Sequence, residues 1–332
     1  MTKSNLTIGV LGLGNWGTAL GQHLASQGHN VIAWTIEEDV VSGINQNHRN
    51  PNFLSNIELS PNLKATGEIG DLESVDYLLS VLPAHVLALV FPKVKLNSNA
   101  IFINATKGLD PKTLQSPVEL AKELIPNLKG YSVISGPSFA KDVAAGLPAG
   151  LVMAADTMDL SKELAELFSA ENLKIYHSDD IVGVELGGIV KNVIAIAAGA
   201  SDGLKLGDSA RAGIVTRGLA EIVALAEAMG AKRDTMFGLA GLGDLVLTAT
   251  CDNSRNRQVG LGLGAGKSLE ASLEAAGSTA EGVLAAKVVS ELAVKNNLEM
   301  PITQLVSKLV QGQVTAAEML KSLMARPSRP EF

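Results

Sequence analysis

A single lysine in an apolar stretch of the chain has the surroundings of a proton donor. Lys191 lies within Gly187 to Ala198, a predicted helical stretch in which it is the only charged residue. A lysine on such a background usually extends its ammonium group to water. One that is removed from water releases its proton more easily and can act as a general acid or base near neutral pH. Because Gly187 and Gly188 would let a ligand approach the helix, we treat Lys191 as a candidate catalytic residue.

An acidic residue in a second apolar stretch is a candidate partner for this lysine. Asp244 lies in Gly241-Leu-Gly-Asp-Leu-Val-Leu, between glycines and aliphatic residues. A buried carboxylate requires a partner that compensates its charge, and Lys191 could supply it. The alternative is that Asp244 caps the helix that follows, and the residues alone leave both interpretations open.

Hydrogen-bond donors are concentrated in one short polar segment, Ser254-Arg255-Asn256-Arg257. Guanidinium groups beside Ser and Asn side chains suit the oxygens of a phosphate group. A solvated cluster of charges would have the same composition, so the segment indicates a phosphate site only together with other evidence.

Further candidates follow two predicted strands. Lys107 follows the strand predicted over Ala100 to Asn104, and Gly136 and Ser138 follow the strand predicted over Tyr131 to Ser135. In open α/β sheets, ligands bind at the carboxyl ends of the strands. We therefore expect Lys107, Gly136 and Ser138 at a ligand-binding edge.

A glycine fingerprint near the N-terminus predicts a dinucleotide cofactor. Gly12, Gly14 and Gly17 stand between a strand predicted over Leu6 to Leu11 and a helix predicted over Asn15 to Gln27. The first glycine permits the tight turn, the second lets a pyrophosphate approach the backbone, and the third lets helix and strand pack closely. The N–H groups at the start of the helix would then hold the phosphates. A purely structural turn is the alternative.

The sequence leaves the choice between NAD and NADP open. An acidic residue at the end of the second strand would bind the ribose 2′-hydroxyl and favour NAD. That strand, predicted over Asn30 to Thr35, is followed by Ile36, with Glu37 and Glu38 just beyond. No arginine stands there to bind a 2′-phosphate.

A second glycine-rich run resembles an ATP-binding loop but departs from its pattern. The run extends from Gly260 to Gly266 and is followed by Lys267. The pattern requires glycine where Leu261 stands, and no strand precedes the run. We expect the end of a helix or a loop there.

The elements that must position these residues change in kind near residue 178. Predicted strands, several of them apolar on both faces, indicate a parallel sheet covered by helices; they span residues 6–11, 30–35, 77–81, 100–104, 131–135, 150–154 and 173–177. Predicted helices then follow at 184–200, 210–229, 278–296, 302–311 and 315–324, and Ser178 to Asp180 supplies candidates for the first N-cap. The chain is therefore predicted to be α/β, with a Rossmann-like, mostly parallel sheet domain over residues 1–178 and an all-α substrate and catalytic domain over residues 179–332.

The composition excludes several classes of function. A chain of 332 residues with 46% hydrophobic residues is long and apolar enough for two folded domains. Its net charge of −7 and its 4% aromatic content argue against nucleic-acid binding. The one cysteine, Cys251, excludes an intrachain disulfide and a cysteine-rich metal site, and we expect no bound metal. Since no segment is a convincing membrane span, we expect no membrane insertion and a cytoplasmic location.

The motifs occur in an order that resembles the bacterial-type NAD(P)-dependent sn-glycerol-3-phosphate dehydrogenases. The resemblance rests on residues 12–17, 105–109, 134–140, 190–192, 241–245 and 254–257. It implies a helical domain of the 6-phosphogluconate dehydrogenase type and NAD(P)H-dependent reduction of dihydroxyacetone phosphate to sn-glycerol 3-phosphate, for glycerophospholipid synthesis. It also implies a homodimer. The alternatives are another dehydrogenase of this architecture and a catalytically silent NAD(P)-binding sensor.

The resemblance also assigns roles to residues. It makes Lys191 the general acid/base. In the mechanism that we expect, Asp244 orients Lys191 and Lys107 assists it. It places substrate at Lys107, Gly136, Ser138, Lys191, Asn192, Asp244, Thr248, Ser254, Arg255 and Asn256, with the phosphate on Arg255 and Asn256. It places the cofactor at Asn15, Trp16, Lys107, Ala140, Arg255, Thr279 and Glu281, beside the fingerprint residues Gly12, Gly14 and Gly17. One departure is Ile36, because the family commonly has Arg or His near this position.

Overall fold

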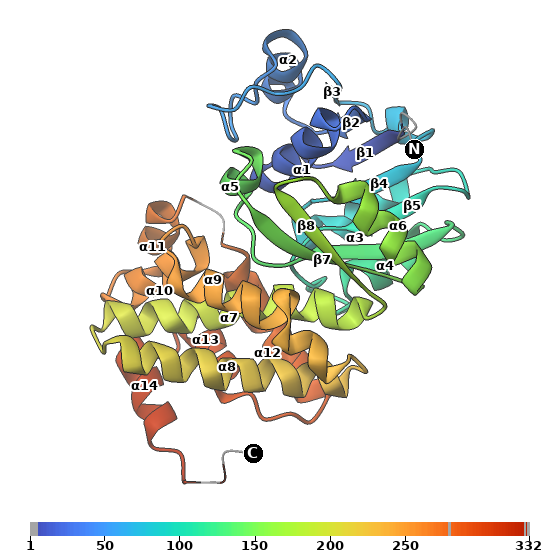
Figure 1. The fold of residues 1–332 in the computed structure, drawn as a ribbon. Coiled ribbons are helices and arrows are strands. Elements are labelled where there is room, and N and C mark those ends of the chain that lie inside the picture. The colour runs from blue at the N-terminus through green and yellow to red at the C-terminus, as the bar shows by residue number, and fades with distance from the viewer. Residues whose placement is uncertain (1–5, 278–279, 329, 331–332) are drawn as a thin grey trace. The chain divides into compact units, whose positions relative to one another are not determined.

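The computed structural model describes residues 6–277, 280–328 and 330. The chain forms two compact units, residues 1–185 and 186–332 (Figure 1). The predicted domain boundary after residue 178 lies just before helix α7 (Ile181–Gly203), and the division between the compact units lies inside this helix. Asp180 accepts a hydrogen bond from the Gly183 N–H at 2.9 Å, which confirms the predicted N-cap region.

The first unit is built on one eight-stranded sheet in the order β3-β2-β1-β4-β5-β6-β7-β8. The strands are β1 (Thr7–Leu11), β2 (Asn30–Trp34), β3 (Leu63–Thr66), β4 (Tyr77–Ser80), β5 (Ile101–Asn104), β6 (Gly130–Ser135), β7 (Ala149–Ala155) and β8 (Leu173–Ser178). Only the β6–β7 pair is antiparallel among the described pairs. Every predicted strand is present, and β3 is an addition that four residues with a central lysine did not indicate.

The carboxyl ends of the central strands meet at one edge of the sheet. Leu11 of β1 is in register with Ser80 of β4, which is in register with Asn104 of β5. Strands β4, β5 and β6 are buried along their whole length, as expected for a sheet covered on both faces. The turns that follow β1, β5 and β6 therefore leave the sheet from the same edge.

Helices and helical turns connect the strands of the first unit. Their bounds are α1 (Asn15–Ser26), α2 (Glu38–Asn47), η1 (Ile69–Leu72), η2 (Ala84–Val86), α3 (Leu87–Val90), η3 (Phe91–Lys93), α4 (Pro117–Leu124), α5 (Ala140–Ala144) and α6 (Met158–Phe168). The short helix α5 packs against α1, and Figure 1 shows these two helices next to each other.

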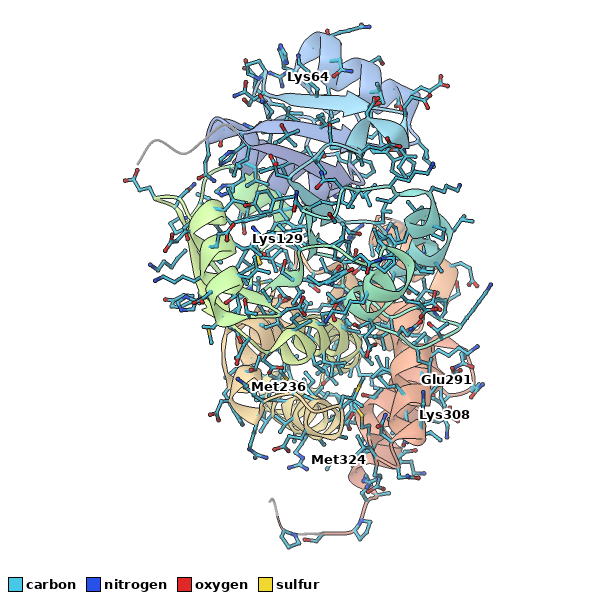
Figure 2. The ribbon with its side chains drawn as sticks, turned by 90° about the vertical axis from the view of Figure 1, so that its right-hand side faces the viewer. Lys64, Lys129, Met236, Glu291, Lys308 and Met324 are labelled. Carbon is cyan, nitrogen blue, oxygen red and sulfur yellow. The ribbon has the colours of Figure 1, made fainter. Side chains whose placement is uncertain are left out.

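The regular secondary structure in the described residues of the second unit is all helical. After α7 come α8 (Asp208–Ala228), η4 (Arg233–Phe237), a π-helical turn η5 (Leu239–Gly243), α9 (Asp244–Thr250), α10 (Arg255–Gly264), α11 (Leu269–Ala275), α12 (Glu281–Lys295), α13 (Pro301–Val310) and α14 (Ala316–Met324). Each predicted helix is present, although the predicted start of α12 at 278 lies outside the described residues. Met236, labelled in Figure 2, is fully buried in this unit. The predicted fold class is confirmed.

Glycines let α7 and α10 cross with their backbones in contact. A Cβ atom at Gly199 of α7 would overlap the Arg257 carbonyl oxygen, and one at Gly260 of α10 would overlap the Ile196 carbonyl oxygen. Gly264, near the end of α10, lies against α7 in the same way. The glycine-rich run is thus a helix end, as expected, and its glycines serve this close packing.

Helix α7 is also long and apolar enough to cross a membrane, judged by length and composition alone. The most apolar stretch of 18 residues in α7 has a mean hydropathy of 1.8, and 89% of this stretch is buried in the protein. The core helix of a folded domain has the same features. No other helix among the described residues meets both criteria.

Candidate functional site

The turn between β1 and α1 has the shape of a phosphate-binding loop. Gly12 has a φ of +100°, which favours glycine, and a Cβ atom at Gly17 would overlap the Gly12 carbonyl oxygen. At Gly14, by contrast, a Cβ atom would meet no protein atom within 4 Å. The space beside Gly14 is therefore open. Helix α1 begins directly after Gly14, and its first N–H groups lack intrahelical acceptors.

The first turn of α1 offers a further donor. It carries no acidic residue and no side-chain cap, so nothing in it repels or replaces an anion. The indole Nε1 of Trp16 is buried and forms no hydrogen bond among the described residues. Together with the open space at Gly14, this donor fits a dinucleotide pyrophosphate, so Gly12, Gly14, Asn15, Trp16 and Gly17 are the residues that would hold one.

The other predicted ligand residues of the first unit leave the same edge of the sheet. Lys107 follows β5 and is half-buried, and Gly136 follows β6 with a φ of +144°. The Ser138 hydroxyl donates to the Gly136 carbonyl oxygen at 3.4 Å. Ala140 is the first residue of α5, which packs against the fingerprint helix α1. The predicted placement at a carboxyl edge is therefore present.

In the second unit, Lys191 is buried with polar partners. Its ammonium group donates to Asp244 Oδ1 and, at 2.8 Å, to Thr248 Oγ1. Lys191 is 6% exposed, Thr248 4% and Asp244 not at all. Lys191 therefore does not extend to water, and Asp244 pairs with it. Asp244 and Thr248 lie four residues apart in α9, about one helical turn, and this spacing brings them onto one face of the helix.

A chain of side-chain amides joins this lysine region to α10 and α12. Asn256 donates from Nδ2 to Asn192 Oδ1 at 2.9 Å, and its Oδ1 accepts from the Gly282 N–H at 2.9 Å. Gly282 follows Glu281, the exposed first residue of α12. Thr279 lies outside the described residues. The structure thus brings Asn192, Asn256 and the start of α12 together.

The start of α10 combines a helix N-terminus with polar side chains. Ser254 is the N-cap residue and accepts from the Arg257 N–H at 3.2 Å. Arg255 is exposed at the first helical position, and Asn256 follows it, nearly buried. A helix N-terminus with an arginine beside it suits an anion.

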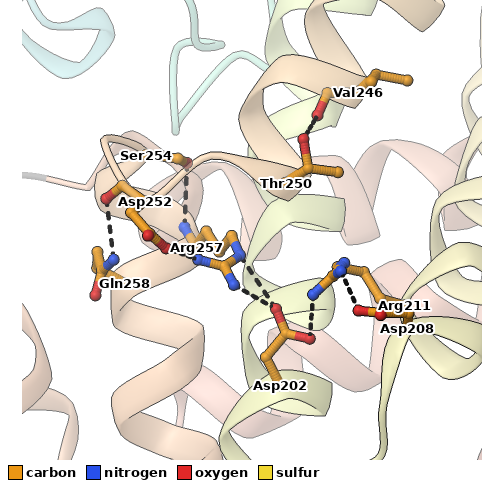
Figure 3. A network of polar contacts seen from close by, with 9 residues as sticks. All are labelled: Asp202, Asp208, Arg211, Val246, Thr250, Asp252, Ser254, Arg257 and Gln258. Carbon is orange, nitrogen blue, oxygen red and sulfur yellow. Dashed lines mark hydrogen bonds and ion pairs between the residues drawn. The ribbon is translucent and has the colours of Figure 1, made fainter.

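Arg257, which the sequence grouped with these donors, has a different environment (Figure 3). Its guanidinium group binds Asp202 of α7 and Asp252 of the loop before α10, at 2.6 Å in each case. Asp202 also binds Arg211 of α8 at 2.9 Å. Arg257 therefore ties the start of α10 to two other helices. No sequence signal paired Asp202 with Arg257, because they are far apart in the chain and share no helical period.

No cluster of metal-ligating side chains accompanies these residues. Among residues 6–277, 280–328 and 330, no group of three or more His, Cys, Asp or Glu could hold a metal ion.

A Rossmann-like sheet with an open phosphate turn, followed by helices that bury a lysine, is the architecture of a dinucleotide-dependent dehydrogenase. The chain matches the family models described as NAD-dependent glycerol-3-phosphate dehydrogenase N-terminus, over residues 7–161, and C-terminus, over residues 180–321. The chain therefore belongs to the NAD-dependent glycerol-3-phosphate dehydrogenase family, which confirms the resemblance and the predicted NAD or NADP cofactor. As a member, it is classed with oxidoreductases.

Individual relatives agree with this assignment. A protein of Nitratidesulfovibrio vulgaris named glycerol-3-phosphate dehydrogenase (NAD(P)+) is 44% identical over 330 residues, covering 98% of this chain and 100% of its own. A protein of Sphingopyxis alaskensis with the same activity in its name is 42% identical, and each chain is covered to 97%. The crystal structure of glycerol-3-phosphate dehydrogenase from Coxiella burnetii is 38% identical with a TM-score of 0.92, covering 97% of this chain and 99% of that one.

Proposed function

We propose that this chain catalyses the reduction of dihydroxyacetone phosphate to sn-glycerol 3-phosphate with NADH or NADPH, and the reverse oxidation. The observation that carries the proposal is the buried cluster of Lys191, Asp244 and Thr248 in a chain of this family. A buried ammonium group needs compensation, and here two oxygens hold it in one place. Lys191 is accordingly the general acid that protonates the carbonyl oxygen, and the general base in the reverse direction.

The chain's own residues stabilise the charge that develops during the reaction. When bound, the reduced nicotinamide supplies the hydride that the ketone carbon accepts. Negative charge then grows on the carbonyl oxygen, and the Lys191 ammonium group stabilises it and donates the proton. Such general acid catalysis contributes roughly 10²–10⁴-fold to the rate. Asp244 orients the ammonium group, and Thr248 restricts its position.

The start of α10 is the proposed phosphate site. Arg255 and Asn256 bind the phosphate oxygens, with Ser254 and the positive end of the helix beside them. Asn192 supports Asn256 through the amide contact at 2.9 Å. Lys107, Gly136 and Ser138 complete the proposed substrate set, and Lys107 also assists Lys191.

The cofactor is proposed to bind mainly at the β1–α1 turn. The residues that would hold it there are Gly12, Gly14, Asn15, Trp16 and Gly17, with Ala140 at the start of α5. The remaining proposed contacts are Lys107, Arg255, Thr279 and Glu281.

The proposed setting follows from the proposed reaction. The product is the backbone precursor of glycerophospholipids, so we place the enzyme in phospholipid synthesis. We further propose a cytoplasmic homodimer with a cofactor domain over residues 1–178 and a substrate domain over residues 179–332.

Replacement of Lys191 tests the mechanism. Lys191→Ala should lower the turnover of dihydroxyacetone phosphate by roughly 10²–10⁴-fold, measured by NADH absorbance, while NADH binding measured by fluorescence is retained. Lys287→Ala is the matched control, because Lys287 lies on α12 with its side chain 66% exposed, and it should be fully active. An active Lys191→Ala variant would remove this lysine from the mechanism.

Replacement of Arg255 tests the phosphate site separately. Arg255→Ala should raise the KM for dihydroxyacetone phosphate by tenfold or more, on the order of a lost charged hydrogen bond, and it should also weaken NADH binding. The same variant should change the reaction of unphosphorylated dihydroxyacetone much less. Equal losses with both ketones would contradict a phosphate contact.

A further inference from the structure

A buried carboxyl group near the start of α7 has no role in the function proposed above. Glu185 is 4% exposed, and no basic side chain forms an ion pair with it among the described residues. Its Oε1 accepts from Asn104 Nδ2 at 2.8 Å and from the Val118 N–H at 3.1 Å. A buried acid that has only neutral donors is costly, so its contacts require an explanation.

The contact to Asn104 determines how the Asn104 side chain is turned. Asn104, the last residue of β5, is completely buried. Its Oδ1 accepts from the Thr106 N–H at 2.8 Å, and its Nδ2 is 3.2 Å from the Thr106 carbonyl oxygen. Rotating the amide by half a turn would set oxygen against the Glu185 oxygen and NH₂ against the Thr106 N–H. Glu185 therefore favours the one orientation in which Asn104 holds Thr106 through both of its backbone groups.

Thr106 in turn holds the segment that carries Lys107. The Thr106 hydroxyl donates to the Leu82 carbonyl oxygen at 2.8 Å, in the connection that follows β4. On the other side of Lys107, a Cβ atom at Gly108 would come within 2.7 Å of the Ala84 Cβ. The backbone on both sides of Lys107 is thus closely restrained, and the restraint on one side leads through Asn104 to Glu185.

We propose that Glu185 is a positioning residue for Lys107, acting through the Asn104 amide and the Thr106 backbone. The inference rests on the proposed function, because it assumes that Lys107 contacts the substrate. Glu185 itself touches no substrate. It sets the backbone from which the Lys107 side chain extends, and its loss should therefore weaken the substrate contact that Lys107 makes.

A double-mutant cycle between Glu185 and Lys107 tests the proposal. Glu185→Ala should raise the KM for dihydroxyacetone phosphate by roughly tenfold, the effect of breaking one buried hydrogen-bond chain. In a Lys107→Ala background, which itself has a raised KM, the same change should add less than twofold, because the two residues then act as one unit. Glu185→Gln keeps an acceptor oxygen for Asn104 and Val118, so its KM should be close to that of the parent enzyme.

Glu221→Ala is the matched control for a purely structural effect. Glu221 is another buried carboxyl, 7% exposed, and it accepts from the N–H groups of Ile302 and Thr303 at the start of α13. Its loss should lower the melting temperature as much as Glu185→Ala does, without changing the KM. If Glu185→Ala does not give folded protein, Asn104→Ser interrupts the same chain one step later and takes its place in the cycle.

The outcomes separate this inference from the proposed function. A raised KM in Lys107→Ala with an unchanged KM in Glu185→Ala would overturn the inference and leave the proposed function intact. The inference would also be overturned if Glu185→Ala raised the KM by the same factor in the parent and in Lys107→Ala, since the two residues would then act independently. An unchanged KM in Lys107→Ala would instead remove Lys107 from the proposed function, and the inference with it.

Discussion

Two guanidinium nitrogens of Arg257 donate to the same carboxylate oxygen of Asp202, Nη2 at 2.6 Å and Nε at 3.1 Å. The second oxygen of Asp202 accepts from Arg211, as Figure 3 shows. One largely buried carboxylate thus joins α7, α8 and α10 near the ends of these helices. Arg257 therefore holds helices of the second unit together and is not a candidate for the phosphate contact.

Removing the charge of Asp202 should therefore affect both stability and substrate binding. Asp202→Asn leaves the buried Arg257 and the partly exposed Arg211 without their shared anion, and breaking a buried ion pair costs about 3–5 kcal/mol. We expect a lower melting temperature and, because the start of α10 is released, a higher KM for dihydroxyacetone phosphate. Asp208→Asn is the control, because Asp208 also binds Arg211 but its side chain is 90% exposed. Equal melting temperatures for the two variants would contradict this role of Asp202.

The fingerprint glycines should separate cofactor binding from stability. A Cβ atom at Gly14 would meet no protein atom within 4 Å, so the melting temperature of Gly14→Val without cofactor should stay within a few degrees of the parent. The added atoms fill the space proposed for the pyrophosphate, and NADH binding, followed by fluorescence, should be lost. Gly17→Ala should do the reverse and destabilise the protein without cofactor, since its Cβ would overlap the Gly12 carbonyl. Tight NADH binding by Gly14→Val would rule out the fingerprint as the cofactor site.

The carboxyl group of Glu185 predicts a pH dependence of stability. Burial raises the pKa of Glu185 from its ordinary value of 4.5 to about 7. The folded state therefore favours the protonated acid, and the stability that Glu185 contributes is complete below pH 4.5 and is lost as the pH rises through about 7. Glu185→Gln cannot lose a proton. Its melting temperature minus that of the parent should rise between pH 4.5 and pH 7 and then level off, in a thermal unfolding series. A constant difference would show that Glu185 ionises alike in the folded and unfolded chains.

The surroundings of Ile36 predict a preference for NADH over NADPH. Ile36 is 81% exposed just beyond β2, and residues 35–48 and 65–76 contain seven acidic residues and no lysine or arginine. Lys64, labelled in Figure 2, lies on β3 in register with Ile32, which is two residues before the end of β2. A 2′-phosphate would be repelled here, whereas a ribose hydroxyl would not.

Introducing a cation at this position should shift the preference. Ile36→Arg should raise kcat/KM for NADPH relative to NADH by about fivefold, the effect of one exposed ion pair. Leu89→Arg, at another exposed apolar position of the first unit, should leave the ratio unchanged. A parent enzyme that prefers NADPH would refute the prediction.

Local patterns were sufficient for most of the fold and for part of the candidate site. Apolar runs identified seven of the eight strands, and the cost of a buried charge pointed to the pairing of Asp244 with Lys191. Glu185 was missed although it is an acid at the start of an apolar helix, which is the same kind of signal. Asn104 was counted only as the end of a strand. Its orientation depends on a partner 81 positions away, and no local period encodes such a pairing.

The crossing of α7 and α10 has a consequence for how this chain can diverge. Where side chains meet, a new rotamer can absorb a substitution, but two main chains in contact have no such freedom. Substitutions on the outer surfaces of both helices therefore have little effect on the distance between the segments that carry Asn192 and Asn256. Outward-facing positions can vary widely under selection, while the register of the two segments stays the same.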